Sequence, residues 1–204
     1  MQLEIGIQST NEKTLQAVSR INHWEQIASH IRRILSFHNM HLHVDLIIGL
    51  PGEGMASFAQ SFNDVYALQA DMLQLGFLKF LKGASMMDLV QPYGYRYMPM
   101  APYEVLVSDA LTYSEIRWFH SFEAVFEYYY NAGRLRHSAP FLIAAQEAGD
   151  AFAFWKRFTD CGRRMGTIRS AMRPKTSTDC CVISQRMPTR LQRNCLTICC
   201  ASTR

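Results

Sequence analysis

The 204-residue sequence has no run of about 18 consecutive apolar residues, so no segment is predicted to be a membrane-spanning helix. Its first ten residues lack the basic end and the small-residue cleavage site of a signal peptide. We therefore expect a soluble, cytoplasmic protein. The first 160 residues also contain no cysteine, which leaves that part of the chain without thiolate ligands for a metal or a cluster.

All six cysteines lie in the last 44 residues, and their spacing fits no metal site. Cys195 and Cys199 are spaced CxxxC, but a CxxxCxxC iron–sulfur motif needs a third cysteine where Ser202 stands. The adjacent pairs 180–181 and 199–200 do not have zinc-finger spacing. We expect these thiols to hold neither a cluster nor another metal ion.

Charge divides the chain into the same two parts. Residues 1–160 carry 12 basic and 16 acidic residues, a net charge of −4, whereas residues 161–204 carry 9 basic and one acidic residue, a net charge of +8. The overall charge of +4 is therefore no argument for nucleic-acid binding by the folded part, and we expect neither a nucleic acid nor a membrane as partner. The tail from residue 161 shows no sustained periodicity, so we predict that it is disordered or the product of a shifted reading frame.

Hydrophobic patterning in residues 1–92 predicts strands and helices in alternation, which is typical of parallel βαβ units. The expected strands are residues 3–9, 42–50 and 73–81, and the expected helices are residues 12–19, 22–38 and 55–69. The second strand, LHVDLIIGL, runs directly into the turn residues of GLPGE. Right-handed crossovers would bring Gln8, residues 49–53 and residues 79–83 to the C-terminal edge of one sheet. Three strands cannot close a barrel, so we expect an open partial (β/α) barrel with an exposed first strand.

Residues 93–160 are predicted to be a helical extension. A loop with a possible short strand begins near Gly94, and helices are expected at residues 113–131 and 140–159. The first of these helices has a strongly aromatic side, for which core packing is a better explanation than base stacking. Its apolar side consists of Trp118, Phe119, Phe122, Val125, Phe126 and Tyr129.

His41, His43 and Asp45 alternate along the second strand and would point to one face of the sheet. Imidazole and carboxylate are ordinary ligands of zinc and iron, so this HxHxD pattern admits a metal-dependent hydrolase as an alternative. Against it, Leu46 occupies the position where the usual HxHxDH pattern has a further histidine. The histidines also lie at the start of the strand, away from the edge where the other polar groups gather.

A second polar set consists of Glu4, Gln8, Arg20 and Asp45. An amide and a carboxylate at strand ends are suited to bind two ribose hydroxyls, and a guanidinium can pair with a carboxylate in a bidentate fork. Each of the four residues alone is compatible with a structural role. Together with the GLPGE turn, they are compatible with a ligand-binding site.

The segments LEIGIQS, NEKTLQAVSR and VDLIIGLPGE resemble the second half of the radical S-adenosylmethionine (SAM) core. The branch that they resemble contains coproporphyrinogen dehydrogenase and the cobalamin-binding magnesium-protoporphyrin ester cyclase type. The later segments LGFLKFLKG, GYRYMPMAPYEVL and EYYYNAGR are similar to the sixth strand and the helical extension of such proteins. The resemblance implies an α/β fold, with residues 1–92 as the last three βα units of the core.

The resemblance also implies a set of cofactor-binding residues. Gln8 and Asp45 would contact the ribose or the methionine end of SAM, Arg20 would bind its carboxylate, and Glu4 would orient this set. Gly49 and Gly52 would let the backbone approach the cofactor, and the strand end around Leu81 would pass near the adenine. In the family, one electron from a four-iron cluster cleaves SAM to a 5′-deoxyadenosyl radical, which abstracts hydrogen from a substrate.

The sequence lacks the CxxxCxxC loop, the upstream strands and the cobalamin domain of that family. The resemblance therefore implies a C-terminal fragment with no catalytic residue of its own, which contributes SAM-binding residues only. The [4Fe-4S] cluster, and cobalamin if the parent binds it, would belong to a missing N-terminal half. An alternative is a non-catalytic half-barrel module that is completed by a partner chain carrying the cluster.

Overall fold

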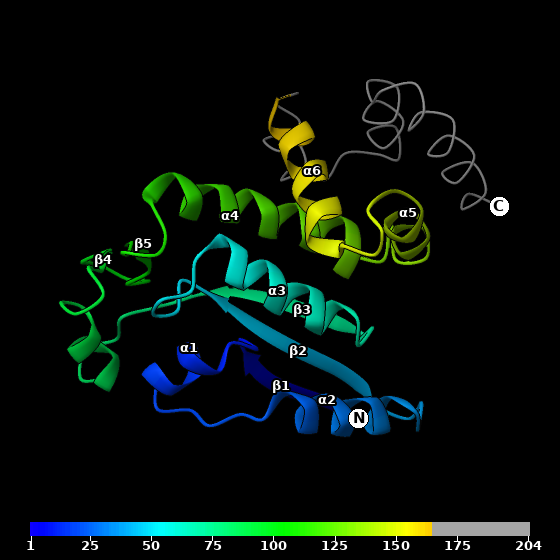
Figure 1. Cartoon of the computed structure of the whole chain (residues 1–204), viewed down its shortest axis with the longest axis horizontal. Coiled ribbons are helices and arrows are strands. Elements are labelled where there is room, and N and C mark those ends of the chain that lie inside the picture. The colour runs from blue at the N-terminus through cyan, green and yellow to red at the C-terminus, as the bar shows by residue number, and fades with distance from the viewer. Residues whose placement is uncertain (165–204) are drawn as a thin grey trace.

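The computed structural model describes residues 1–164, and its first half is an alternation of strands and helices in the predicted order (Figure 1). The elements are β1 (Gln2–Gln8), α1 (Glu12–Ala17), α2 (Trp24–Leu35), β2 (His41–Ile48), α3 (Met55–Tyr66) and β3 (Met72–Phe77). Asn11 begins α1 by accepting hydrogen bonds from the backbone of Lys13 and Thr14. The predicted tail falls largely on residues 165–204, which lie outside the described residues.

The three strands form one parallel sheet in the order β1-β2-β3, which confirms the predicted βαβ arrangement. In the register, Gly6 is paired with Asp45, and Asp45 is paired with Gln74. Within residues 1–164 the sheet does not close into a barrel, and β1 has a single strand neighbour. The first strand is therefore an edge, as the sequence predicted.

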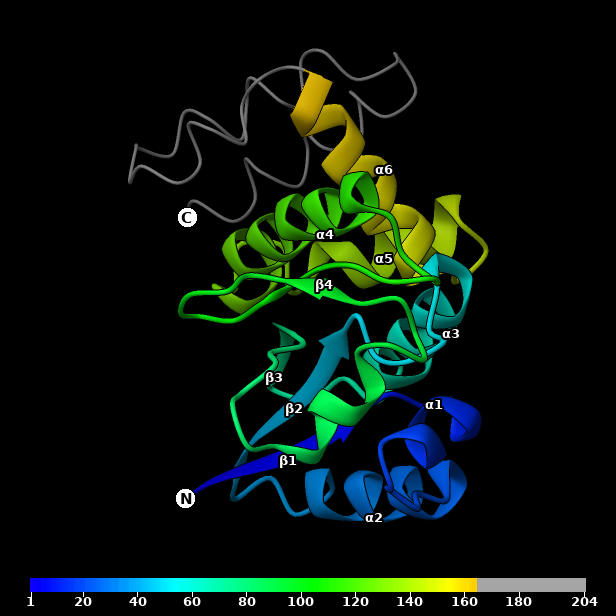
Figure 2. The ribbon, with the colours of Figure 1, turned by 90° about the vertical axis from the view of Figure 1, so that its left-hand side faces the viewer.

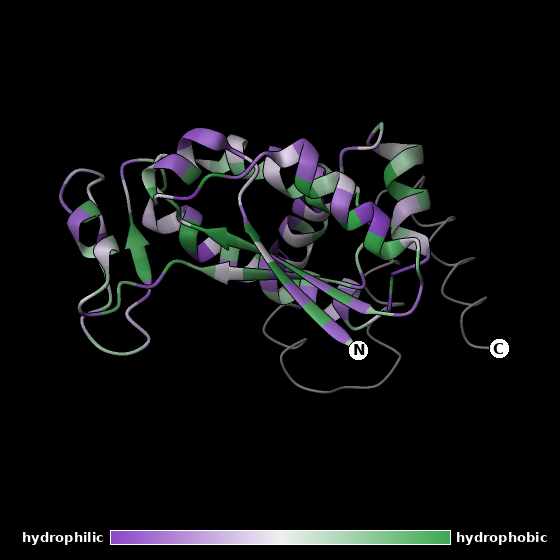
Figure 3. Ribbon diagram, turned by 90° about the horizontal axis from the view of Figure 1, so that it is seen from below, coloured by the Kyte–Doolittle hydropathy of each residue, from purple (hydrophilic) through white to green (hydrophobic). Residues whose placement is uncertain are grey.

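The two faces of the sheet differ in composition. Leu42, Val44, Leu46 and Ile48 of β2 are buried in one core with residues of α2 and α3, and Leu15 of α1 is buried as well. Figure 2 shows these three helices along one side of the sheet. The alternate positions of β2, from His41 to Ile47, are exposed or half-buried, and Figure 3 shows the resulting bands of green and purple along the strands. The face of the sheet that carries these polar side chains is therefore the one that α1, α2 and α3 do not cover.

The third strand ends earlier than expected. Residues 73–81 were predicted as one strand, but β3 ends at Phe77 and the following segment pairs with a different part of the chain. Phe80 N donates to Tyr103 O at 2.8 Å, and Val105 N donates to Leu78 O at 2.9 Å. The short helix η1 (Ser85–Leu89) and the hairpin of β4 (Arg96–Tyr97) and β5 (Val105–Val107) follow, beyond the C-terminal ends of the strands (Figure 1).

The helical extension consists of α4 (Tyr113–Phe126), the π-helical turn η2 (Glu127–Asn131), α5 (Ser138–Gln146) and α6 (Ala151–Arg164). A capping box between Thr112 and Glu115 starts α4. The prediction of one helix over residues 140–159 is wrong, because the chain turns between α5 and α6. Ala148 and Gly149 have φ angles of 50° and 91°, which no α-helix contains.

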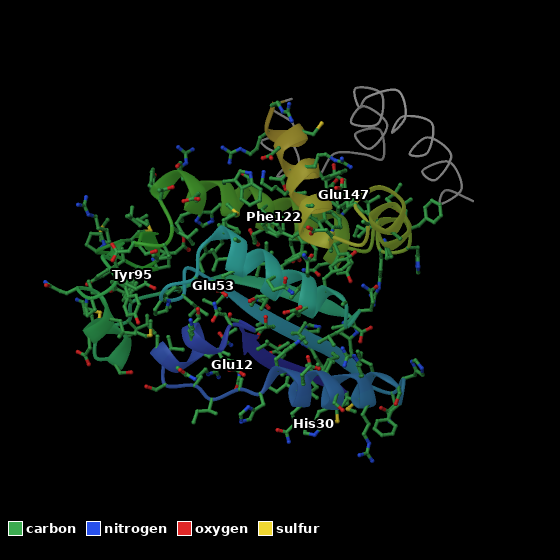
Figure 4. The ribbon with its side chains drawn as sticks, viewed as in Figure 1. Glu12, His30, Glu53, Tyr95, Phe122 and Glu147 are labelled. Atoms are coloured by element: carbon green, nitrogen blue, oxygen red, sulfur yellow. The ribbon has the colours of Figure 1, made fainter. Side chains whose placement is uncertain are left out.

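Aromatic side chains fill the space between α3, α4 and α6. Phe62 of α3 is fully buried, and its ring centroid lies 5.3 Å from that of Phe122 and 5.2 Å from that of Phe126. Phe152 and Trp155 of α6 pack on the same rings, and Figure 4 labels Phe122. The predicted core role of the aromatic side of α4 is therefore confirmed. No helix within residues 1–164 is long and apolar enough to cross a membrane.

Candidate functional site

Gly6 lies at the centre of a polar cluster on the accessible face of the sheet. The pairing of β1 with β2 shifts register between Gly6 and Gln8, and Gln8 has a φ of 70°. This backbone places the Gln8 amide over Gly6, so closely that a Cβ at position 6 would collide with Gln8 Nε2. The Gln8 amide therefore occupies the space above Gly6, and it can lie there because glycine has no side chain.

Arg20 reaches the same place from the loop after α1. Its Nη1 donates to Gly6 O at 3.3 Å and lies 4.0 Å from the Cβ position of Gly6. Arg20 is exposed, and no carboxylate within residues 1–164 forms an ion pair with it. Its guanidinium therefore has donors available for a ligand.

Asp45 lies beside Gly6 in the register of the parallel sheet. Burial raises the pKa of its carboxyl, the nearby charge of Glu4 adds to that rise, and His43 opposes it. Glu4 is exposed and occupies the next outward-facing position of β1, paired with His43. The structure thus brings together Glu4, Gln8, Arg20 and Asp45, which are 41 positions apart along the chain at most. The cluster offers an amide, a guanidinium and carboxylates to one ligand.

The other residues that were predicted to lie near the cofactor are Gly49, Gly52 and Leu81, and their surroundings differ. Gly49 is buried with a φ of 93°, and Val105 Cγ1 lies 2.8 Å from where its Cβ would be. Its carbonyl accepts a hydrogen bond of 2.8 Å from Tyr95, so the hairpin segment, rather than open space, lies against this glycine. Gly52 is exposed with a φ of 70° and open space around it. Leu81 is 54% exposed and follows the segment that pairs with Tyr103.

Glu53, the last residue of GLPGE, has a structural role that the sequence pattern did not predict. It is 1% exposed, and its Oε1 accepts hydrogen bonds from Ser9 at 2.5 Å, Ser61 at 3.2 Å and Ser57 at 3.4 Å. Burial raises the pKa of Glu53, although the three hydroxyls lower it. Glu53, Ser57 and Ser61 recur at every fourth position, which was a visible signal, but Ser9 is 44 positions away.

The two histidines of HxHxD have other partners. His41 Nδ1 lies 3.6 Å from Asp71 Oδ1, and His43 Nδ1 lies 3.2 Å from Gln2 Nε2 and 4.0 Å from Glu4 Oε1. In the part of the chain that the structure describes, no group of three or more histidine, cysteine or acidic residues is placed to hold a metal ion. Cys161 on α6 is the only cysteine in that part, so three thiolates for a cluster are not available there.

Two comparisons with known proteins found similarity. A family described as proteins of unknown function (DUF4080) matches residues 91–176, a range that begins before the hairpin and extends past residue 160. The chain is also 33% identical over 86 residues to the oxygen-independent coproporphyrinogen-III oxidase-like protein HemZ of Bacillus subtilis (strain 168). That alignment covers 41% of this chain and 17% of the relative. The second similarity indicates a radical SAM relative of this chain.

Proposed function

We propose that the chain is the C-terminal part of a radical SAM enzyme and contributes residues that bind SAM. The observation that carries the proposal is the cluster around Gly6, where an amide, a guanidinium and a carboxylate meet on the accessible face of an open parallel sheet. The similarity to a coproporphyrinogen-III oxidase-like protein supports it. The sheet would be the last three strands of a partial (β/α) barrel, with residues 93–160 as its helical extension.

The proposed roles follow the chemistry of each side chain. Arg20 would bind the methionine carboxylate of SAM through charge-assisted hydrogen bonds, because no carboxylate among the described residues occupies it. Gln8 and Asp45 would bind the ribose hydroxyls, the amide and the carboxylate together providing both donors and acceptors. Glu4 would orient Asp45 and Arg20. Gly49 and Gly52 would let the backbone approach the cofactor, and the strand end around Leu81 would lie near the adenine.

The described residues do not fit a four-iron cluster, since they include a single cysteine. In this proposal the [4Fe-4S] cluster belongs to an N-terminal half of the enzyme. If the complete enzyme binds cobalamin, the proposal places cobalamin in that N-terminal half as well. SAM bound to the complete enzyme would supply a 5′-deoxyadenosyl radical. The role of the present chain is to bind and orient SAM.

Isothermal titration of the full chain tests the proposed site. Arg20→Ala should weaken SAM binding by about 10- to 150-fold, the value of a hydrogen bond to a charged group. The same change should leave binding of adenosine unaltered, because adenosine has no carboxylate. Arg32→Ala, on the exposed side of α2, is the matched control and should bind SAM like the wild type.

Equal affinity of Arg20→Ala and the wild type for SAM would refute the assignment of Arg20. The double change His41→Ala and His43→Ala separates the proposal from the metal-dependent hydrolase. Under the proposal, the double variant keeps SAM binding nearly unaltered. A hydrolase would instead show stoichiometric zinc that the double variant loses.

A second candidate is a half-barrel module completed by a partner chain that carries the cluster, and the two sheet edges favour it. At the edge of β3 the backbone of Leu73 is satisfied, because the Asn131 side chain donates to Leu73 O at 2.9 Å and accepts from Leu73 N at 3.3 Å. The edge of β1 has no further strand within residues 1–164. If a cluster-bearing chain is the partner, amide protons of β1, but not those of β3, should become protected from exchange when it is added. Unchanged exchange in β1 would contradict this candidate.

Sequencing the genomic DNA on both sides of the reading frame tests the fragment proposal. It predicts an in-frame CxxxCxxC motif upstream and a change of frame in the region that encodes the cysteine-containing tail. A promoter and a stop codon immediately before Met1 would contradict a damaged gene and favour the partner-chain candidate.

A further inference from the structure

The loop between β1 and α1 is attached to α3 by side-chain hydrogen bonds. Thr10 N donates to Ser61 Oγ at 3.1 Å, Thr10 Oγ1 donates to Asp64 Oδ2 at 2.7 Å, and Asn11 Nδ2 donates to Ser57 Oγ at 2.8 Å. Ser9 Oγ donates to Glu53 Oε1 at 2.5 Å. Each of these bonds joins a residue that follows Gln8 to α3 or to Glu53 before it.

Glu53 is the point where these contacts converge. Its Oε1 accepts from Ser9, Ser57 and Ser61, while its Oε2 is buried without a hydrogen-bond partner among the described residues. Three buried or half-buried serine hydroxyls therefore depend on the same carboxylate oxygen as their hydrogen-bond acceptor. Figure 4 labels Glu53 near the start of α3, and Glu12 on the exposed side of α1.

Gln8 stands one residue before Ser9 and has a left-handed backbone with a φ of 70°. A residue with a Cβ is unfavourable in this region, so the surrounding contacts must hold it there. This backbone turns the Gln8 amide back over Gly6 and into the cluster with Arg20. The Ser9–Glu53 hydrogen bond is the nearest side-chain contact that fixes the chain directly after Gln8.

We propose that Glu53 is a positioning residue of the proposed SAM site, and that it holds the end of β1 so that the Gln8 amide lies over Gly6. This inference rests on the proposed function for its ligand but not for its effect on Gln8. Glu53 itself does not touch the cofactor in this account. Its carboxylate acts through Ser9 on the conformation of Gln8.

The test compares Glu53→Ala and Glu53→Gln in the full chain, with Glu12→Ala as a control that also removes a carboxylate. The first readout is the intraresidue NOE between the amide and Hα protons of Gln8, which is strong only when φ is positive. The second is the affinity for SAM. Glu53→Gln keeps an oxygen acceptor and should retain both, whereas Glu53→Ala should lose the strong NOE and bind SAM about tenfold more weakly, the value of one lost hydrogen bond.

Glu12→Ala should match the wild type in both readouts. If Glu53→Ala does not fold, Ser9→Ala removes the same contact and should weaken the Gln8 NOE in the same way. A strong NOE in Glu53→Ala, or in Ser9→Ala when that variant is the one tested, would overturn the proposal. So would loss of the NOE in Glu53→Gln. If the wild-type chain bound no SAM, the proposed function would fall, and the NOE comparison alone would decide the role of Glu53.

Discussion

Replacing Gly6 with alanine separates the binding site from the fold. Gly6 does not have a positive φ, so alanine can adopt its backbone conformation, but the new Cβ would collide with Gln8 Nε2. The colliding atom is the end of a flexible side chain, which can move at low cost in folding free energy. Removing a glycine from a compatible position adds about 0.4–1 kcal/mol to stability through the unfolded state. The thermal midpoint of Gly6→Ala should therefore equal or exceed that of the wild type.

Binding should change in the opposite direction. Arg20 Nη1 lies 4.0 Å from the new Cβ, an ordinary contact distance, so the guanidinium can stay while the Gln8 amide moves. Loss of a hydrogen bond from Gln8 to the ligand is worth about 0.5–1.5 kcal/mol, which weakens SAM binding by about 2- to 13-fold.

Circular dichroism gives the midpoint and isothermal titration gives the affinity. Gly133→Ala is the control, because Gly133 has a φ of 78° and open space around it. This control should lose about 1 kcal/mol of stability, as expected for a left-handed position, and bind SAM normally. Wild-type affinity of Gly6→Ala for SAM would refute this role of Gly6, and so would a greater loss of stability than in Gly133→Ala.

Three further changes test the site and the fold. Because burial raises the pKa of Asp45 above its ordinary value of 3.8, the folded state holds this proton more tightly than the unfolded state, and stability falls as the pH rises through the range between the two pKa values. Asp45→Asn should therefore be more stable than the wild type at pH 7 but bind SAM more weakly, and denaturant titrations at pH 4 and 7 that show no gain at pH 7 would contradict this. Asn131→Ala removes both hydrogen bonds to Leu73 and should lower the free energy of unfolding by about 1–3 kcal/mol, with faster hydrogen exchange of the Leu73 amide. Unchanged exchange of that amide would show that Asn131 does not protect the edge of β3. Phe62→Ala should cost about 3–5 kcal/mol in chemical denaturation, whereas Phe141→Ala, at a residue 62% exposed, should stay within about 0.5 kcal/mol; similar losses would show that the aromatic core is wrongly placed.

Patterns that are local in sequence were sufficient for the strands and the first helices. The apolar run from Leu46 to Leu50 and the turn after it predicted β2, and its parallel pairing followed from the helices between the strands. The end of β3 was not predictable, because Leu78, Lys79 and Phe80 alternate like the continuation of a strand. Leu78 O and Phe80 N instead bond to Val105 and Tyr103, more than 20 positions away. The break at Gly149 was visible as a glycine, but a strongly apolar helix pattern on both sides concealed it.

The sequence predicted the polar side chains of the candidate site, but it did not predict the role of Gly6 between them. Glu4, Gln8, Arg20 and Asp45 were selected from their residue types and from the resemblance to the radical SAM core, and the structure places them near Gly6. That Gly6 makes room for the Gln8 amide depends on a register shift between the strands, which no periodicity records. The same is true of Glu53, whose partner Ser9 is brought to it by the fold.

The most direct test of the account is a titration of the isotope-labelled full chain with SAM, followed by amide chemical shifts. The account predicts that the perturbed amides are those of Gly6, Gln8, Arg20 and Asp45, and that Arg20→Ala reduces the perturbation at each of them. Perturbation confined to α4, α5 and α6, or no perturbation at millimolar SAM, would contradict the claim that this chain contributes a SAM-binding site.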